Sequence, residues 1–357
     1  MSNPIKLALV GIGRAGWGMH VRDIEKKQDK YTYVAACDLL PERVEKMVEK
    51  FGCKGYSNID ELLSDSDAEI VCIATRSCDH YEHGIKVLKS GKDLLMEKPM
   101  GLTLAQAEDL FATAKQLGRR VYMRHNRRFE SVFTEVKNVI ESGILGNVYE
   151  INISQGSFQH RDDWQTISEF GGGQLLNWGP HIIDHSLRLL GSPLKNITGE
   201  LKQVTAGGDC EDHVIIHYES EAGRTVNMCI SGGMALNMGR KFYVYGDRGA
   251  MICGEGGSDF NIKLRYIDPA QEIPPVISSP ETPGAAFGAS GTYASATQVD
   301  WVEKEYTAPS EDLSVIWDYM YESYRNGAQY PITEDEALQV MQVAEQIRKG
   351  TKFDYHK

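Results

Sequence analysis

The stretch Gly11-Ile12-Gly13-Arg14-Ala15-Gly16 decides the fold of the first part of this 357-residue chain. It follows the apolar run Ile5–Val10 and precedes a predicted helix over Ala15–Lys27. A strand before the turn and a helix after it are the context in which such a glycine turn binds a dinucleotide. The stretch therefore predicts a Rossmann-type domain at the start of the chain.

Each residue of this turn has an expected part in the cofactor site. Gly11 permits the tight turn, Gly13 lets the backbone approach the pyrophosphate, and Gly16 lets the helix pack close to the strand. The unpaired N–H groups at the start of the helix then face the phosphates. We predict that Ile12 and Arg14 contact the cofactor together with the three glycines.

An acidic residue at the end of the next predicted strand indicates which dinucleotide binds. Asp38 follows the strand Tyr31–Cys37, where a carboxylate can accept hydrogen bonds from both ribose hydroxyls. The same charge would repel a 2′-phosphate, so we predict NAD as the cofactor, with NADP as the alternative. Arg43 keeps that alternative open, because an arginine near this position can favour NADP.

Strand and helix patterns alternate over the first third of the chain. Short apolar strands separated by helices imply βαβ units and a doubly wound parallel sheet, which we assign to residues 1–124. The predicted strands are Ile5–Val10, Tyr31–Cys37, Glu69–Ala74, Asp93–Met96 and Arg120–Met123, and the predicted helices are Ala15–Lys27, Pro41–Lys50, His80–Lys89 and Thr103–Leu117.

After residue 124 the pattern changes to longer strands separated by polar turns. It predicts an α+β domain over residues 125–357, with an open, mostly antiparallel sheet and helices on one face. We expect this domain to bind substrate and to form the oligomer contacts. The predicted strands are Val148–Phe158, His213–Glu219, Thr225–Gly232, Lys241–Tyr245 and Ala250–Cys253, the helices are Ile182–Leu190, Glu311–Asn326 and Thr333–Lys349, and Ala270–Thr297 is a long loop.

Composition excludes several classes of protein. The formal net charge is -12 and the chain has no basic stripe or tail, which argues against nucleic acid as a partner. No apolar run approaches the ~18 residues of a membrane span, and no secretory signal precedes the first strand. The seven scattered cysteines form no C-x-x-C pair, so we predict reduced thiols in a cytoplasmic protein, and no metal site.

Two motifs outside the glycine turn carry a family resemblance. The first is Met96-Glu97-Lys98-Pro99, preceded by Ile73-Ala74-Thr75, His80 and Gly91-Lys92. The second runs from Gly171 to Asp184 and reads GGGQLLNWGPHIID. With these motifs in this order, the chain resembles the Gfo/Idh/MocA family over essentially its whole length. Members of that family are oxidoreductases similar to inositol dehydrogenase and glucose–fructose oxidoreductase.

The resemblance assigns roles to the first motif. It implies that Lys98 lies near the nicotinamide and the reacting hydroxyl, that the following proline is cis, and that Glu97 positions the cofactor. Thr75 and His80 are expected in the same cofactor site. Lys98 also comes at the carboxyl end of a parallel strand, the edge where open α/β sheets bind ligands. The alternative for such a lysine is an exposed loop charge.

His181, in the second motif, is the predicted proton acceptor. Removing a hydroxyl proton as hydride leaves needs a base that titrates near neutrality. Asp184 would share its helix face and could hold the imidazole ring, and we also predict that it contacts substrate. A lone histidine at a helix start is otherwise a cap or a surface group.

One position departs from the family pattern. Asn177 stands where many members have an aspartate that assists the histidine, and an amide cannot stabilise an imidazolium with a full charge. Either Lys98 and His181 act without it, another carboxylate substitutes, or catalysis is impaired. The segment with Asp162, Asp163 and Trp164 offers the nearest substitutes. We predict that Asp163, Trp164 and Asn177 bind substrate, although an exposed polar turn is the alternative for that segment.

Two further predictions concern basic residues. The crossover after the last Rossmann strand approaches substrate in the family, so Asn126 and Arg127 are predicted to bind substrate. Salt bridges at the domain junction are the alternative for Arg127 and Arg128. Arg76 follows Thr75 where the family often has a small residue, and contacts with the cofactor or with a substrate anion are both open.

Together these features predict an NAD-dependent dehydrogenase that acts on a secondary hydroxyl of a sugar, glycoside or cyclitol. Lys98 would stabilise the negative charge that develops on the reacting oxygen. Two alternatives stay open: an epimerase or eliminase that retains NAD, and a non-catalytic binding protein that responds to NAD or sugar. The open sheet also predicts a homodimer or homotetramer.

Overall fold

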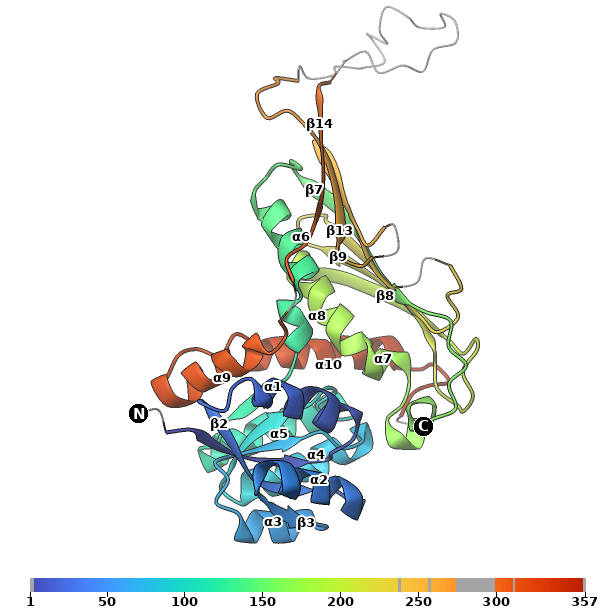
Figure 1. Ribbon diagram of the computed structural model, residues 1–357. Coiled ribbons are helices and arrows are strands. Elements are labelled where there is room, and N and C mark those ends of the chain that lie inside the picture. The colour runs from blue at the N-terminus through green and yellow to red at the C-terminus, as the bar shows by residue number, and fades with distance from the viewer. Residues whose placement is uncertain (1–2, 237–238, 256–257, 274–298, 311, 356–357) are drawn as a thin grey trace, which may run out of the picture.

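The computed structural model describes residues 3–236, 239–255, 258–273, 299–310 and 312–355. These residues form two sheets, each with its own helices (Figure 1). Most of the predicted loop Ala270–Thr297 lies outside the described residues, as does the first residue of the predicted helix Glu311–Asn326.

The first sheet is parallel throughout, and its strand order is β3-β2-β1-β4-β5-β6. This is the order of a Rossmann domain, and it reverses between β1 and β4. A ligand is therefore expected at the carboxyl ends of those two strands. The strands are β1 (Ile5–Val10), β2 (Tyr31–Cys37), β3 (Lys54–Tyr56), β4 (Ile70–Ile73), β5 (Asp93–Met96) and β6 (Val121–Met123), and the helices are η1 (Gly16–Val21), α1 (Arg22–Glu25), α2 (Pro41–Phe51), α3 (Ile59–Asp65), η2 (Ser77–Asp79), α4 (His80–Lys89) and α5 (Leu104–Leu117).

The helix predicted over Ala15–Lys27 contains an unexpected feature. Its middle, η1, is a π-helical turn, and the α-helical pattern resumes only at α1. A π-turn inside a helix is rare and often occurs at a functional site, because the extra residue re-aims side chains. Here it directs His20 into the core, where its ring is fully buried.

The second sheet has eight strands in the order β14-β13-β12-β11-β7-β10-β9-β8. Every neighbouring pair is antiparallel except β7 with β10, as the prediction of a mostly antiparallel sheet requires. The strands are β7 (Val148–Gly156), β8 (Leu194–Lys202), β9 (His213–Ser220), β10 (Thr225–Ser231), β11 (Gly239–Gly246), β12 (Gly249–Cys253), β13 (Asn261–Ile267) and β14 (Trp301–Thr307).

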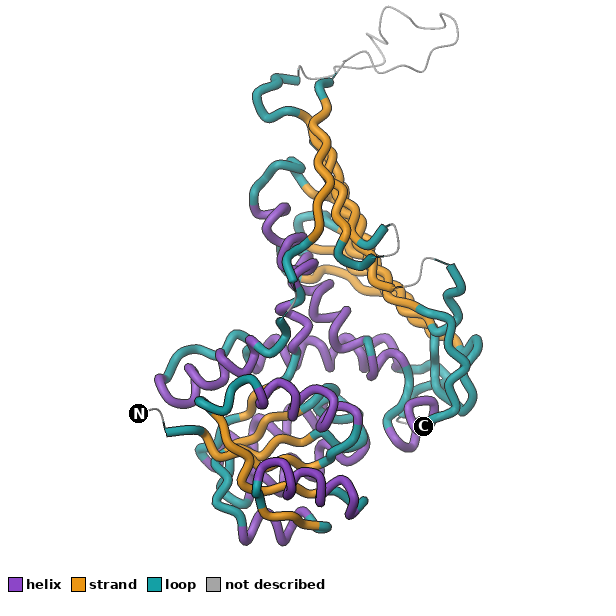
Figure 2. The backbone as a smooth tube through the Cα atoms, in the orientation of Figure 1, coloured by secondary structure: helices purple, strands orange, loops and turns teal. Residues whose placement is uncertain are grey.

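Helices cover one face of the second sheet, and Figure 2 shows them on the side that faces the first sheet. They are α6 (Ser131–Glu141), α7 (Gln174–Asn177), α8 (Gly179–Leu189) and α10 (Glu334–Arg348). The capping box predicted at the start of α10 is present, since Thr333 and Glu336 bond to each other's backbone N–H. Within the described ranges, no helix is both long and apolar enough to cross a membrane.

The chain returns to the first sheet after β14. Helix α9 (Val315–Asn326) buries Ile316, Trp317 and Met320 in the hydrophobic core of the first sheet. Helix α10 contributes to both cores, with Met341 in the first and Val343 in the second. The division of the chain at residue 124 stays a prediction, but these contacts show that the last helices tie the two sheets together.

Candidate active site

The glycine turn has the geometry that a dinucleotide requires. Gly11 has φ +91°, and a Cβ there would lie 2.6 Å from the carbonyl of Ala74 at the end of β4. A Cβ on Gly16 would lie 2.1 Å from the carbonyl oxygen of Gly11. By contrast, a Cβ on Gly13 would meet only the Arg43 guanidinium, at 3.8 Å. The turn is thus packed against protein at Gly11 and Gly16 and open at Gly13, where the pyrophosphate is expected.

Asp38 is fixed beside this turn by backbone groups. Its carboxylate accepts hydrogen bonds from the N–H of Ile12 at 2.7 Å and of Leu40 at 3.0 Å. The Arg43 guanidinium lies 3.4 and 3.5 Å from the two carboxylate oxygens. The carboxylate that was predicted to bind the ribose is therefore partly paired with a cation.

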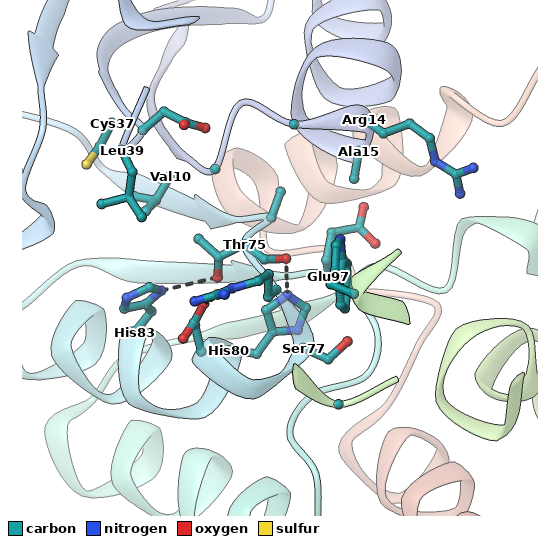
Figure 3. A pocket seen from close by; sticks show the side chains of 18 of the residues that line it. Val10, Arg14, Ala15, Cys37, Leu39, Thr75, Ser77, His80, His83 and Glu97 are labelled. Carbon is teal, nitrogen blue, oxygen red and sulfur yellow. Dashed lines mark hydrogen bonds and ion pairs between the residues drawn. The ribbon is translucent and has the colours of Figure 1, made fainter. Parts of the chain in front are cut away.

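A cavity of about 880 Å³ extends from Asp38 to the motif of Lys98 (Figure 3). This volume is within the ordinary range for small-molecule and cofactor sites. The predicted site residues that line it are Gly11, Gly13, Arg14, Asp38, Thr75, His80, Glu97, Lys98, Asp163, Trp164 and Asn177. Residues between Arg161 and Asn177, in loops and short helices, supply one wall, so the cavity is built from both halves of the chain.

The remaining predicted residues do not line this cavity. Ile12 and Gly16 are buried members of the glycine turn itself, and the others are Asn126, Arg127, His181 and Asp184. Sequence reasoning missed several lining residues near Asp38, namely Ser57, Asn58, His83 and Lys86. They follow β3 or lie on α4, and the failure to predict β3 hid the first two. His83 Nδ1 lies 3.2 Å from Thr75 Oγ1, a contact drawn in Figure 3.

The Lys98–Pro99 peptide bond is cis, as the resemblance implied. His80 lies beside it, with Nδ1 2.6 Å from the Pro99 carbonyl oxygen and Nε2 3.1 Å from that of Thr75. The ring therefore connects the end of β4 to the loop after β5. Its placement indicates that His80 shapes the cavity wall in addition to the cofactor contact predicted for it.

Lys98 is half-buried in the cavity wall, and its ammonium faces Asn177. Nζ donates to the Asn177 carbonyl oxygen at 2.7 Å and to its Oδ1 at 3.2 Å. Burial lowers the pKa of Lys98 to about 8, and the charge of Glu97 opposes that fall while Arg127, Arg14 and Arg124 add to it. An ammonium has three donors, so one is left for a substrate oxygen after the two bonds to Asn177.

His181 lies in the first turn of helix α8. Its ring is 6% exposed and has ring contacts with Trp178 at 6.0 Å and His125 at 6.4 Å. Nδ1 has no hydrogen-bond partner among the described residues. Burial, then the charges of Lys98 and Arg127, hold the pKa of His181 well below its usual range. The imidazole is therefore neutral at pH 7 and able to accept a proton, but it does not titrate near neutrality as was expected of the base.

Asp184 was predicted to hold the His181 ring, but it binds Arg128 instead. Asp184 is 1% exposed, and its two oxygens accept from Nε and Nη2 of Arg128. Although burial raises the pKa of Asp184, its pairing with Arg128 lowers that pKa further. This pair favours the salt-bridge alternative for Arg128 at the junction of the two sheets, where Glu336 of α10 joins it.

We expect Asp184→Ala to destabilise the protein by about 3 kcal/mol, because it leaves a largely buried guanidinium with one carboxylate instead of two. Urea unfolding measures the change. Lys137→Ala is the control, since its exposed pair with Glu141 at 4.0 Å should contribute less than about 1 kcal/mol. Unchanged stability with a raised substrate KM would instead favour the predicted substrate contact.

Three of the other predicted residues, Asp163, Arg127 and Arg76, each form an ion pair with a nearby residue. Asp163 pairs with Arg161 at 2.6 Å and caps the short helix η4 (Trp164–Thr166), on the cavity wall beside Asn177. Arg127 pairs with Glu130 and lies 4.4 Å over the Trp178 ring. Arg76 pairs with Asp79 and stacks 4.7 Å over Phe170, on the cavity wall. This brings Arg76 within reach of a bound cofactor or substrate.

Comparison with known proteins agrees with this arrangement. Residues 5–125 match a family described as "Oxidoreductase family, NAD-binding Rossmann fold", and residues 133–252 match the "GFO/IDH/MocA C-terminal domain". The chain belongs to the Gfo/Idh/MocA family of oxidoreductases. The expected family, the Rossmann sheet and the second sheet are thereby confirmed.

Three proteins illustrate the likeness. The scyllo-inositol 2-dehydrogenase (NADP(+)) IolW of Bacillus subtilis is 25% identical, covering 98% of this chain and 94% of its own. An NAD-binding protein from Listeria innocua has a TM-score of 0.81 at 22% identity, covering 98% and 97%. The WlbA dehydrogenase of Bordetella pertussis, solved with NADH and UDP-GlcNAcA, has a TM-score of 0.75 at 18% identity, covering 96% and 97%. At these identities, the two structures support the fold alone.

Proposed function

We propose that this oxidoreductase is an NAD-dependent dehydrogenase that oxidises, or in reverse forms, a secondary hydroxyl of a sugar, glycoside or cyclitol. One observation carries the proposal: the Lys98 ammonium lies at the end of the dinucleotide cavity, with one donor left, near the neutral base His181. The scyllo-inositol dehydrogenase among the relatives supports the substrate class.

Each residue near Lys98 has a separate role in the proposed reaction. Bound NAD supplies the hydride acceptor for the carbon that carries the hydroxyl. His181 accepts the hydroxyl proton, so the C–H and O–H bonds of the substrate break and a carbonyl forms. Lys98 donates a hydrogen bond to the oxygen as negative charge develops on it. Asn177 holds the lysine, and we propose that it also contacts substrate with Asp163, Trp164, Asn126 and Arg127.

A substrate panel tests this function. The purified protein is incubated with NAD or NADP and a set of sugars, glycosides and inositols, and the products are identified by mass spectrometry. Reduced cofactor together with a product two hydrogens lighter supports the dehydrogenase. An isomer or an elimination product without free NADH would point to the epimerase or eliminase. NAD binding without turnover on the whole panel would point to the regulatory binding protein.

The cofactor preference rests on Asp38. We expect Asp38→Ala to lower kcat/KM for NAD by about 10- to 100-fold, because hydrogen bonds to a charged group contribute about 1.5–3 kcal/mol. Arg43→Ala should lower kcat/KM for NADP and leave that for NAD nearly unchanged. Steady-state rates with both cofactors measure this. A wild-type preference for NADP, the cofactor named for the Bacillus subtilis relative, would overturn our assignment of NAD.

We further propose a homodimer or homotetramer that uses the face of the second sheet without helices (Figure 1). A cytoplasmic location is also proposed, because each of the seven cysteines is a free thiol. Light scattering of the purified protein tests the oligomer, and a monomer at micromolar concentration would contradict it.

A further inference from the structure

Glu97 lies next to the proposed catalytic lysine, and buried polar groups surround its carboxylate. Oε1 lies 2.8 Å from Nε2 of His20 and accepts from Nη1 of Arg124 at 2.9 Å. Oε2 accepts from the backbone N–H of Lys98 at 3.3 Å. The orientation of this carboxylate therefore affects the position of the Lys98 backbone.

The network continues from Arg124 to a distant part of the chain. Nη2 of Arg124 donates to Asp23 at 2.8 Å, and the indole N–H of Trp317 donates to the same Asp23 oxygen at 3.0 Å. The Trp317 and His20 rings also pack in a T-shaped arrangement, with their centroids 5.4 Å apart. Trp317 lies on α9, outside the two segments that match the family descriptions. We call His20, Asp23, Arg124 and Trp317 the relay.

Burial and neighbouring charges determine the protonation states of His20 and Glu97 in this network. His20, Arg124 and Trp317 are each at most 1% exposed. Burial lowers the pKa of His20, so the ring is neutral and its Nε2 must carry the proton that faces Glu97. Burial would raise the pKa of Glu97, but the Arg124 charge and the His20 hydrogen bond bring it well below its usual range. The carboxylate is therefore ionised and held in one orientation.

The π-turn connects the relay to the cofactor turn. Gly16, the first residue of η1, packs directly against the Gly11 carbonyl oxygen, and His20 is four residues further on. The same short segment therefore forms the phosphate turn and supplies a donor to Glu97. Helix α9 closes the far side of the network through Trp317.

We propose that the relay residues His20, Asp23, Arg124 and Trp317 are positioning residues that fix Glu97 and, through it, the Lys98 ammonium at the reacting oxygen. None of them lines the cavity, and His20 and Arg124 both bond to the Glu97 carboxylate, so we assign them an effect on Lys98 through Glu97. The proposal rests on the function proposed for Lys98. It adds a role for a helix that the two matched family segments do not include.

Variants of His20 and Trp317 test the proposal kinetically. His20→Ala should lower kcat by about 10- to 100-fold with little change in KM for NAD, because a small displacement of a reacting group has effects of this size. His20→Gln should restore most of the rate, since its amide N–H can replace the Nε2–H bond. Trp317→Phe keeps the ring and loses the donor to Asp23, so we expect a smaller loss of about 2- to 10-fold.

Tyr33→Phe is the matched control. Tyr33 lies in the same core, and its hydroxyl has no hydrogen-bond partner in the described part of the chain. We expect wild-type kcat from this variant. The primary deuterium isotope effect on kcat should rise in His20→Ala, because hydride transfer becomes slower. A wild-type rate in His20→Ala, or a loss that His20→Gln does not recover, would overturn the relay.

A second measurement works without turnover, and so separates the relay from the proposed function. Competitive acetylation of Lys98 across a pH series, followed by mass spectrometry, reports its pKa. The charged groups that act on Lys98 are Glu97, Arg14, Arg124 and Arg127. Of these groups Glu97 raises the pKa of Lys98, and the neutral rings of His80, His125 and His181 also interact with Lys98, so a loosened Glu97 in His20→Ala should let the labelling curve move to lower pH. An unchanged curve overturns the relay even in a protein that oxidises no sugar.

Discussion

Lys98→Met should lower kcat by about 10²- to 10³-fold and leave NAD binding largely intact. The methionine keeps the length of the side chain but supplies no donor to the oxygen on which charge develops, and loss of one such donor has an effect of this size. Single-turnover rates with the substrate identified from the panel measure the change. Titration of NADH fluorescence shows whether the cofactor still binds. A loss below about fivefold would mean that Lys98 does not contribute in this way.

The pH dependence of kcat tests the protonation state of Lys98. Burial sets its pKa at about 8, so the ammonium is present below that pH and is lost above it. If the ammonium is the active form, the rate falls as the pH rises through about 8. If the neutral amine acted as a base, the rate would rise over the same range, and the assignments of Lys98 and His181 would have to be exchanged.

Asn177→Asp is the matched variant for this pH profile. The Asn177 amide oxygen lies 3.2 Å from Nζ, so an aspartate would place a negative charge next to the ammonium. An opposite charge at that distance raises the pKa of a lysine. The fall in rate should therefore move to higher pH. This variant also introduces the aspartate that the family resemblance led us to expect here, and it tests whether Asn177 impairs catalysis.

The parts of the fold that were predictable have strong local signals. The predicted bounds of β2, β5 and α4 agree with those observed. In these elements the apolar residues of the sequence are the ones that are buried, so the local pattern is clear. The edge strands β8 and β14 were missed, since charged and polar residues alternate there with few buried ones. Edge strands commonly carry such charges, which prevent pairing with another chain.

Helix α6 was missed for a different reason. Its sequence is rich in Val, Ile and Thr, which favour strands intrinsically, yet Val132, Phe133, Val136 and Val139 form one buried face. Packing of this face in the core of the second sheet outweighs the local preference.

The site residues show the same contrast between local signals and long-range packing. Several residues of the glycine turn and of the Lys98 motif line one cavity, because the turn or strand end that carries them positions them locally. Partners far apart in sequence were not predicted. Arg128 with Asp184, and Trp317 with Asp23, are brought together only by the packing of α8 and α9. A spacing of three residues suggested that Asp184 would serve His181, but a guanidinium from another element competes for the same carboxylate and has the stronger interaction.

His181→Ala should lower kcat by about 10²- to 10⁴-fold, the usual contribution of a general base. Because its pKa lies well below the ordinary value, the wild-type rate should show no acid limb near pH 6.5, where an exposed histidine titrates. His217 on β9 is the control, because its ring pairs with Asn227 at 2.6 Å and does not line the cavity. His217→Gln should keep the wild-type rate. If His181→Ala retains its rate while Lys98→Met does not, another group accepts the proton, and the nearby His125 becomes the residue to change next.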